Sequence, residues 1–185
     1  MSNQLNEAIK ALMATLKKPH ESTDLMRQVA EILQKQIGHR LFTILLVAEN
    51  REDTVRVYSD NLSAYPVNRI KRMGVTLWGS QVIHGCQAYI GKNDDDIRWA
   101  FPDHELIKSL GLSSALSIPI VYKGQCLAVL NLQHEANWYR DEHVAIGESV
   151  GIFLIPAILA LQESFKPPRT DSVNGIGDIC RDVPQ

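Results

Sequence analysis

The chain has 185 residues, which is enough for one well-buried core and too few for two ordinary domains. Its 19 basic and 21 acidic residues nearly cancel, so the composition has no electrostatic footprint for nucleic acid or an anionic membrane. Three scattered cysteines are too few for a disulfide framework and fit a reducing compartment.

The chain has no pattern typical of secretion or membrane insertion. Polar residues interrupt the first ten positions, where a secretory signal would need an apolar run. The longest apolar run, 152–161, contains Pro156 and is about half of the roughly 20 residues that a membrane span needs. We therefore expect a cytoplasmic protein.

Two amphipathic helices are predicted at the start of the chain. Apolar residues recur at helical spacing over 5–16 and over 22–37, with a break around Pro19. Ser22 is a candidate N-cap of the second helix, and Gly38 stands where a helix commonly ends. We treat 1–20 as a separate N-terminal helix and 21–164 as the domain.

The middle of the chain alternates between strands and short helices. Strands are predicted at 41–49, 54–60 and 87–90 from apolar, β-branched or alternating residues. Thr76 can cap a helix that ends at Gly85, and Asp103 can cap another that stops at Gly111. The polar segment 91–100 is expected to be a loop over the mouth of the fold.

The segment from Ser113 to His134 predicts a hairpin, with strands at 114–121 and 125–133. Gly124 supplies the positive φ that a tight turn commonly needs. Pro119 cannot donate a ladder hydrogen bond, so the first strand should be at an edge or bulged there. A long apolar helix follows over 141–164, with a kink at Pro156, and 165–185 is predicted to be a flexible tail. Together these elements predict an α+β fold.

The hairpin resembles the closing strands of GAF domains. The likeness extends to 78–86, 89–91 and 101–112, and in total it covers 22–163. The chain therefore resembles members of the GAF domain family, in particular stand-alone bacterial GAF-domain proteins. This resemblance implies a central antiparallel sheet of five to six strands, flanked by helices.

The resemblance also implies a ligand site between one sheet face and the segments that cross it. Apolar pockets with a few placed polar groups suit small molecules, here an aromatic or amphipathic ligand. The alternative is that the aromatic side chains only fill the core. Asn131, a lone amide in an apolar strand, needs a partner from the ligand or from the protein. The mapped residues are Trp78, Cys86, Tyr89, Trp99, Phe101, Ser117 and Asn131.

One branch of the family, the free methionine sulfoxide reductases, is an enzymatic alternative. Cys86 after Gly85 and the run from Phe101 to His104 resemble that branch, but the branch's catalytic cysteine falls at Ile107. A hydrocarbon cannot supply the thiolate nucleophile. We therefore expect no catalytic residues.

The histidines and cysteines lack the paired spacing of zinc motifs, so no metal site is predicted. The Cys-His pair of bilin-binding relatives is absent, as is the signature of mammalian cyclic-nucleotide relatives. The sequence does not identify a cofactor or the ligand. The sequence predicts a non-catalytic small-molecule sensing module.

The terminal helices, 5–16 and 144–161, are more apolar than solvated helices need to be. GAF domains commonly dimerise through such helices, so the resemblance implies a two-fold homodimer. The alternative is that both apolar stripes pack on the subunit's own sheet. A separate signalling partner is expected, and nucleic acid or membrane is not.

Overall fold

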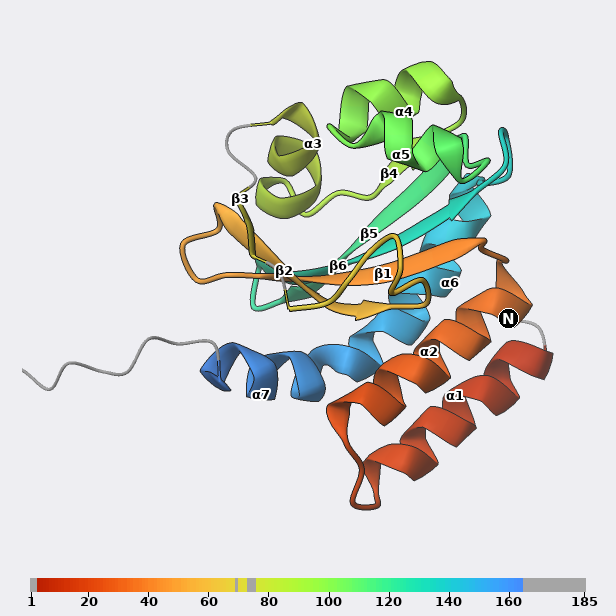
Figure 1. Ribbon diagram of the computed structural model, residues 1–185. Coiled ribbons are helices and arrows are strands. Elements are labelled where there is room, and N and C mark those ends of the chain that lie inside the picture. Colours follow the sequence, from red (N-terminus) through yellow and green to blue (C-terminus); the bar gives the residue numbers. More distant parts are fainter. Residues whose placement is uncertain (1–2, 69, 73–75, 165–185) are drawn as a thin grey trace, which may run out of the picture.

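A six-stranded antiparallel sheet separates two layers of helices (Figure 1). The computed structural model describes residues 3–68, 70–72 and 76–164. The strand order is β3-β2-β1-β6-β5-β4, and every neighbouring pair is antiparallel. The strands are β1 (Leu41–Val47), β2 (Asp53–Ser59), β3 (Ile70–Arg72), β4 (Tyr89–Gly91), β5 (Ser114–Tyr122) and β6 (Gln125–His134). This arrangement confirms the predicted α+β fold.

The central strands are β1 and β6, which are buried on both faces apart from the first residue of β6. Their continuous apolar composition suits strands that are covered on both sides. Lys123 and Gly124 both have positive φ, 50° and 74°, so the predicted tight turn between β5 and β6 is confirmed. At Pro119 β5 is an edge strand, because β4 pairs only with 115–117. The missing N–H of the proline therefore costs no ladder hydrogen bond.

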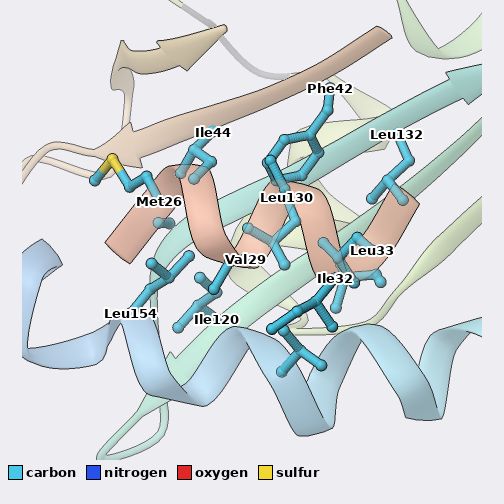
Figure 2. Packing of buried hydrophobic residues seen from close by; sticks show 14 of the residues in the cluster. Met26, Val29, Ile32, Leu33, Phe42, Ile44, Ile120, Leu130, Leu132 and Leu154 are labelled. Carbon is cyan, nitrogen blue, oxygen red and sulfur yellow. The ribbon is translucent and has the colours of Figure 1, made fainter. Parts of the chain in front are cut away.

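One face of the sheet packs against α2 (Ser22–Gln36) and a long C-terminal helical segment (Figures 1 and 2). This segment consists of α6 (Asp141–Gly151), a 3₁₀ turn at Ile152–Leu154 and α7 (Ile155–Ser164). Fully burying one such aliphatic side chain stabilises the fold by roughly 1.5–3 kcal/mol. The main core contains Met26, Val29, Leu33, Phe42, Ile44, Ile120, Leu130, Leu132 and Leu154.

Helix α1 (Asn3–Leu16) lies outside this layer and packs on α2 rather than on the sheet (Figure 1). It buries Leu5 and Leu12 and leaves Met13 47% exposed. The apolar stripe of this helix is therefore partly satisfied within the subunit.

The opposite face of the sheet carries short elements, α3 (Leu77–Gly79), the π-helical turn η1 (Ser80–His84), α4 (Asp94–Ala100) and α5 (His104–Ser109) (Figure 1). Thr76 caps α3 as predicted, because its Oγ1 accepts a hydrogen bond from Gly79 N at 2.9 Å. The predicted cap at Ser22 is wrong, whereas Asp103 is the N-cap residue of α5 as predicted. Helix α2 begins at Ser22, and its N-cap residue Glu21 makes no side-chain cap bond. The backbone oxygen of Asp103 accepts a hydrogen bond from Ile107 N at 3.1 Å, but its side chain makes no cap bond.

The expectation that 91–100 forms a loop is also wrong, since most of this segment is α4. Asn93 caps the helix by accepting hydrogen bonds from Asp95 N at 2.9 Å and Asp96 N at 3.1 Å. Carboxylates in the first turn also interact favourably with the helix dipole. The polar composition that suggested a loop is thus an N-terminal helix signal.

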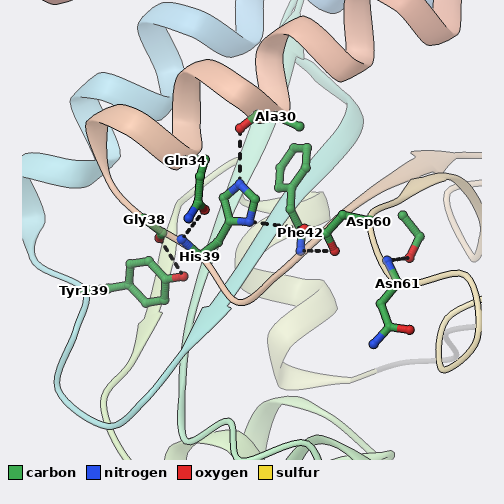
Figure 3. Close-up of polar contacts among 9 residues, drawn as sticks. Ala30, Gln34, Gly38, His39, Phe42, Asp60, Asn61 and Tyr139 are labelled. Carbon is green, nitrogen blue, oxygen red and sulfur yellow. Dashed lines mark hydrogen bonds and ion pairs between the residues drawn. The ribbon is translucent and has the colours of Figure 1, made fainter.

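A polar cluster at His39 ties α2 to the first two strands (Figure 3). The ring Nε2 lies 3.2 Å from Ala30 O and Nδ1 lies 3.2 Å from Asp60 Oδ2. Asp60 also accepts a hydrogen bond from Phe42 N at 2.9 Å. Gly38, with φ of 89°, ends α2 just before this cluster, as the sequence predicts.

The C-terminal helical segment, Asp141–Ser164, is long and apolar enough to cross a membrane by length and composition alone. Within it, Val150, Leu154 and Ile158 are completely buried in the main core. Core helices of soluble proteins pass the same test, so this is weak evidence for a span.

Candidate ligand-binding site

A row of polar residues crosses the sheet on the face beneath α3, α4 and α5. Directly opposed residues of neighbouring antiparallel strands share a face and interact through their side chains. The row therefore presents hydroxyl and amide groups to the same side of an otherwise apolar sheet. Its members, in order across four pairings, are Tyr89, Ser117, Asn131, Thr43 and Ser59.

Three residues of the predicted site form a buried hydrogen-bonded chain. Trp78 Nε1–H donates to Ser117 Oγ at 3.1 Å, and Ser117 Oγ–H donates to Asn131 Oδ1 at 2.7 Å. Trp78 is 1% exposed and Ser117 is fully buried. The amide oxygen of Asn131 thus has a partner within the protein. The hydrogen bond from the Trp78 indole to Ser117 holds α3 against β5.

The predicted aromatic residues form two pairs of neighbouring rings. Phe101 packs beside Trp78, with ring centroids 6.0 Å apart. Tyr89 belongs to the same buried cluster as Trp78, and its ring stacks on that of Trp99 with centroids 5.2 Å apart. Its hydroxyl donates to Asp96 O at 2.7 Å. Burial first, and the charge of Asp96 second, raise the pKa of Tyr89 to about 12. Trp99 is 46% exposed, so the structure does not bring its ring into the buried Trp78 group.

Cys86 completes the predicted set and packs, partly buried, against the cluster that contains Trp78. Phe101 borders this cluster and also a second one, formed by Leu41, Tyr65, Ile97, Ile107, Leu112 and Ala115. Phe101 therefore connects the cluster that contains Trp78 to the second cluster, which the sequence analysis did not predict as part of the site.

That neighbouring region contains a half-buried arginine. Arg56 is a residue of β2 and lies opposite Leu45 of β1. Its guanidinium is 4.8 Å from the ring centroid of Tyr65. Its Nη1 donates to Pro66 O at 3.2 Å, whereas its buried Nε has no partner among the described residues. Burial lowers the pKa of Arg56, and the negative charge of Asp103 partly opposes that effect.

Tyr65 links this arginine to α5. Its hydroxyl donates to Asp103 Oδ2 at 3.0 Å. Burial, followed by the charge and the hydrogen bond of Asp103, raises the pKa of Tyr65 well above its ordinary value. The Tyr65 phenol is therefore neutral and acts as a hydrogen-bond donor.

Gln133 is a second polar residue that the sequence analysis did not select. It pairs with Leu41 and Ala115, both members of the second cluster, and is 5% exposed. Its Oε1 is buried and has no hydrogen-bond partner within the described ranges. An unpaired donor on Arg56 and an unpaired acceptor on Gln133 thus border one apolar cluster. Buried polar groups usually have partners, so a ligand is a physical reason for both.

A sequence signal for Arg56 did exist. The β2 segment alternates polar and apolar residues, which normally indicates one solvated face. In a sheet that is covered on both faces, the polar positions of such a strand point into the interior.

The described part of the chain contains no group of three or more His, Cys, Asp or Glu that could hold a metal ion.

The profile of the GAF domain family matches residues 19–151, and the chain therefore belongs to this family. No curated protein matches the sequence. The fold is similar to the GAF domain of a phosphoenolpyruvate-protein phosphotransferase from Acinetobacter. The TM-score is 0.68 at 15% identity, over 91% of this chain and 99% of that one.

Two further solved structures have a similar fold. The GAF domain of a two-component sensor histidine kinase from Bacillus halodurans has a TM-score of 0.60 at 16% identity, over 76% of this chain and 97% of that one. A type II free methionine-R-sulfoxide reductase from Thermoplasma acidophilum has a TM-score of 0.58 at 11% identity, over 75% and 93%. At these identities the likeness shows the fold alone.

Proposed function

We propose that this GAF domain is a non-catalytic, cytoplasmic module that binds a small molecule between the sheet and α3 to α5. The observation that carries the proposal is the half-buried Arg56, whose Nε has no partner among the described residues. The Arg56 guanidinium lies over the ring of Tyr65, which belongs to the apolar cluster that Phe101 packs against. Gln133 pairs with two other members of this cluster. Small-molecule sites combine apolar walls with a few placed polar groups in this way.

The side chains indicate the chemistry of the ligand. A guanidinium suits a carboxylate, phosphate or carbonyl acceptor, and the free Oε1 of Gln133 suits a donor. Phe101 and Tyr65 suit a flat or aromatic body between the two polar ends. The predicted residues Trp78, Ser117 and Asn131 would then form the wall rather than the contacts that select the ligand.

Native mass spectrometry of the protein purified from its source tests this proposal. We expect a retained small mass that is lost in Arg56→Gln, because the substitution removes the charge and the Nε–H donor. Arg98→Gln is the matched control, since Arg98 is a surface arginine paired with Asp95 on α4. Equal retention by both variants, or no retained mass in repeated preparations, contradicts the assignment.

The reductase of similar fold makes a thiol-based enzyme the rival proposal. Ile107, where that branch's nucleophile is expected, is completely buried with Leu41 and Tyr65. It offers neither a thiol nor access to substrate. We expect no reduction of free methionine sulfoxide with dithiothreitol present. A turnover that disappears in Cys86→Ser would instead support the enzyme.

Signalling is proposed to pass through the C-terminal helical segment to a second copy and then to a separate protein. Ile152 and Leu159 are 56% and 37% exposed on this segment. They lie two helical turns apart, so they share one stripe. Light scattering should give a dimer that Ile152→Glu weakens at least tenfold. Leu62→Glu, a control at a residue 60% exposed in a loop, should not change the mass. A monomeric wild-type protein would refute this arrangement.

A further inference from the structure

We propose that Cys86 and Cys126 are a modification site, a thiol pair that a peroxide converts to a reversible disulfide. The two residues come from different elements. Cys86 follows η1 in the connection to β4, and Cys126 lies near the start of β6. Cys126 is a buried member of the apolar cluster that contains Trp78, and Cys86 packs against that cluster.

The β5–β6 hairpin brings the two cysteines together. Cys86 Sγ lies 3.9 Å from Gly124 O, and Gly124 precedes Cys126 by two positions in the hairpin. Cys86 Sγ also lies 3.8 Å from Ile83 O. Because residues 85–88 belong to no strand ladder, the backbone around Cys86 can adjust to the geometry of a disulfide.

The two thiols have different environments. Cys86 is partly exposed and can meet a small oxidant, whereas Cys126 is 3% exposed. Burial raises the pKa of Cys126 to about 12, and the nearby Cys86 adds to this effect. Cys86 is therefore the thiol that attacks the peroxide, and Cys126 is the thiol that resolves the product.

Arg51 places a positive charge beside this pair. Its Nη2 donates to Ile83 O at 2.8 Å, the same carbonyl that Cys86 Sγ approaches. Its buried Nε has no partner within the described ranges, and its charge opposes the rise in the pKa of Cys126. A guanidinium in this position can donate a hydrogen bond to the oxygen that leaves from a peroxide.

The chemistry proceeds in two steps. The Cys86 thiolate attacks one peroxide oxygen and the O–O bond breaks. Cys86 becomes a sulfenic acid, and the leaving oxygen takes up a proton. Cys126 sulfur then attacks the Cys86 sulfur, the S–O bond breaks, and the hydroxide leaves with the Cys126 proton as water. Two thiols have then given two electrons to one peroxide, and a dithiol reverses the change.

Hydrogen peroxide treatment of the full chain in a Cys180→Ser background tests the proposal. This substitution leaves Cys86 and Cys126 as the only cysteines of the sequence. After one equivalent of peroxide, the intact mass should fall by two hydrogen atoms. Peptide mapping should find Cys86 joined to Cys126, and dithiothreitol should restore both thiols.

Three variants separate the roles of the residues. Cys126→Ala should leave Cys86 as a sulfenic acid that dimedone traps, and Cys86→Ser should abolish the reaction. Arg51→Gln should slow disulfide formation at least fivefold. Arg98→Gln, a surface control on α4, should leave the rate unchanged. Circular dichroism of each variant checks that it folds.

Three results would overturn the proposal. The first is oxidation of Cys86 to sulfinic acid while Cys126 stays reduced. The second is a disulfide between two chains, and the third is no loss of thiols after treatment with peroxide. If Cys126→Ala does not fold, the peptide map of the Cys180→Ser protein decides alone. Ligand retention in the preceding section is measured on reduced protein, so the two proposals can fail separately.

Discussion

Ser117→Ala tests whether the buried polar chain holds α3 to the sheet. The substitution removes one hydroxyl and leaves two groups without partners, Trp78 Nε1–H and Asn131 Oδ1. An unsatisfied buried donor costs about 1–3 kcal/mol, and each lost hydrogen bond contributes about 1 kcal/mol. The oxygen leaves almost no cavity. We therefore expect the free energy of unfolding to fall by about 2–4 kcal/mol.

Urea unfolding measures this change. The midpoint should fall by about 1–2 M at an unchanged slope, because typical slopes are about 1–3 kcal/mol per M. Ser109→Ala is the matched control, since the Ser109 hydroxyl bonds Leu106 O at 2.7 Å on the exposed side of α5. Its effect should stay within about 0.5 kcal/mol.

A double-mutant cycle with Trp78→Phe isolates the indole contact. Phenylalanine removes the Nε1–H donor, so the two substitutions together should cost about 1 kcal/mol less than their sum. Strict additivity, or a loss of less than about 0.5 kcal/mol in Ser117→Ala, would refute the reasoning. In that case the three groups would not form a dry, connected chain in solution.

Three further predictions concern stability. Gly38→Ala should cost about 2–4 kcal/mol in urea unfolding, because its φ is 89° and a Cβ would lie 2.9 Å from the ring of Trp138. Gly124→Ala, with φ of 74° and nothing within 4 Å, should cost only about 1–2 kcal/mol, and equal losses would contradict the steric argument. Asn93→Ala should cost about 1 kcal/mol through the lost cap of α4, and an unchanged midpoint would show that the cap is not needed. Burial lowers the pKa of His134 below 6.5, so the folded state binds fewer protons than the unfolded state and stability falls as pH drops through 6.5. His134→Phe should make this slope of unfolding free energy against pH shallower, and an identical slope would exclude His134 as its source.

Local patterns were sufficient wherever neighbouring residues dictate the backbone. The apolar run at 41–47 and the Lys123-Gly124 turn both adopt the predicted structure. Thr76 and Gly38 likewise mark the helix ends that their side chains and φ angles favour. The short strand Ile70–Arg72 was not predicted, because three residues with two basic side chains carry no periodic signal.

The candidate site could be predicted only in part. Trp78, Phe101, Ser117 and Asn131 do lie together, as the family resemblance implied. Their use as ligand contacts stays a prediction. The sequence did not reveal that Trp78 itself supplies a donor to this polar row, because the two partners are 39 positions apart.

The sequence alone was enough to predict the family, every strand except β3 and every helix of the sheet's two layers except α4, since hydrophobic period and turn chemistry act over a few residues. The tertiary structure decided which polar groups are buried and which of them lack partners. Arg56 in a half-polar strand becomes an interior donor only because helices cover both faces of the sheet. Cys86 and Cys126 become one site only because a hairpin folds back over η1. Long-range packing creates both features, and no local pattern encodes it.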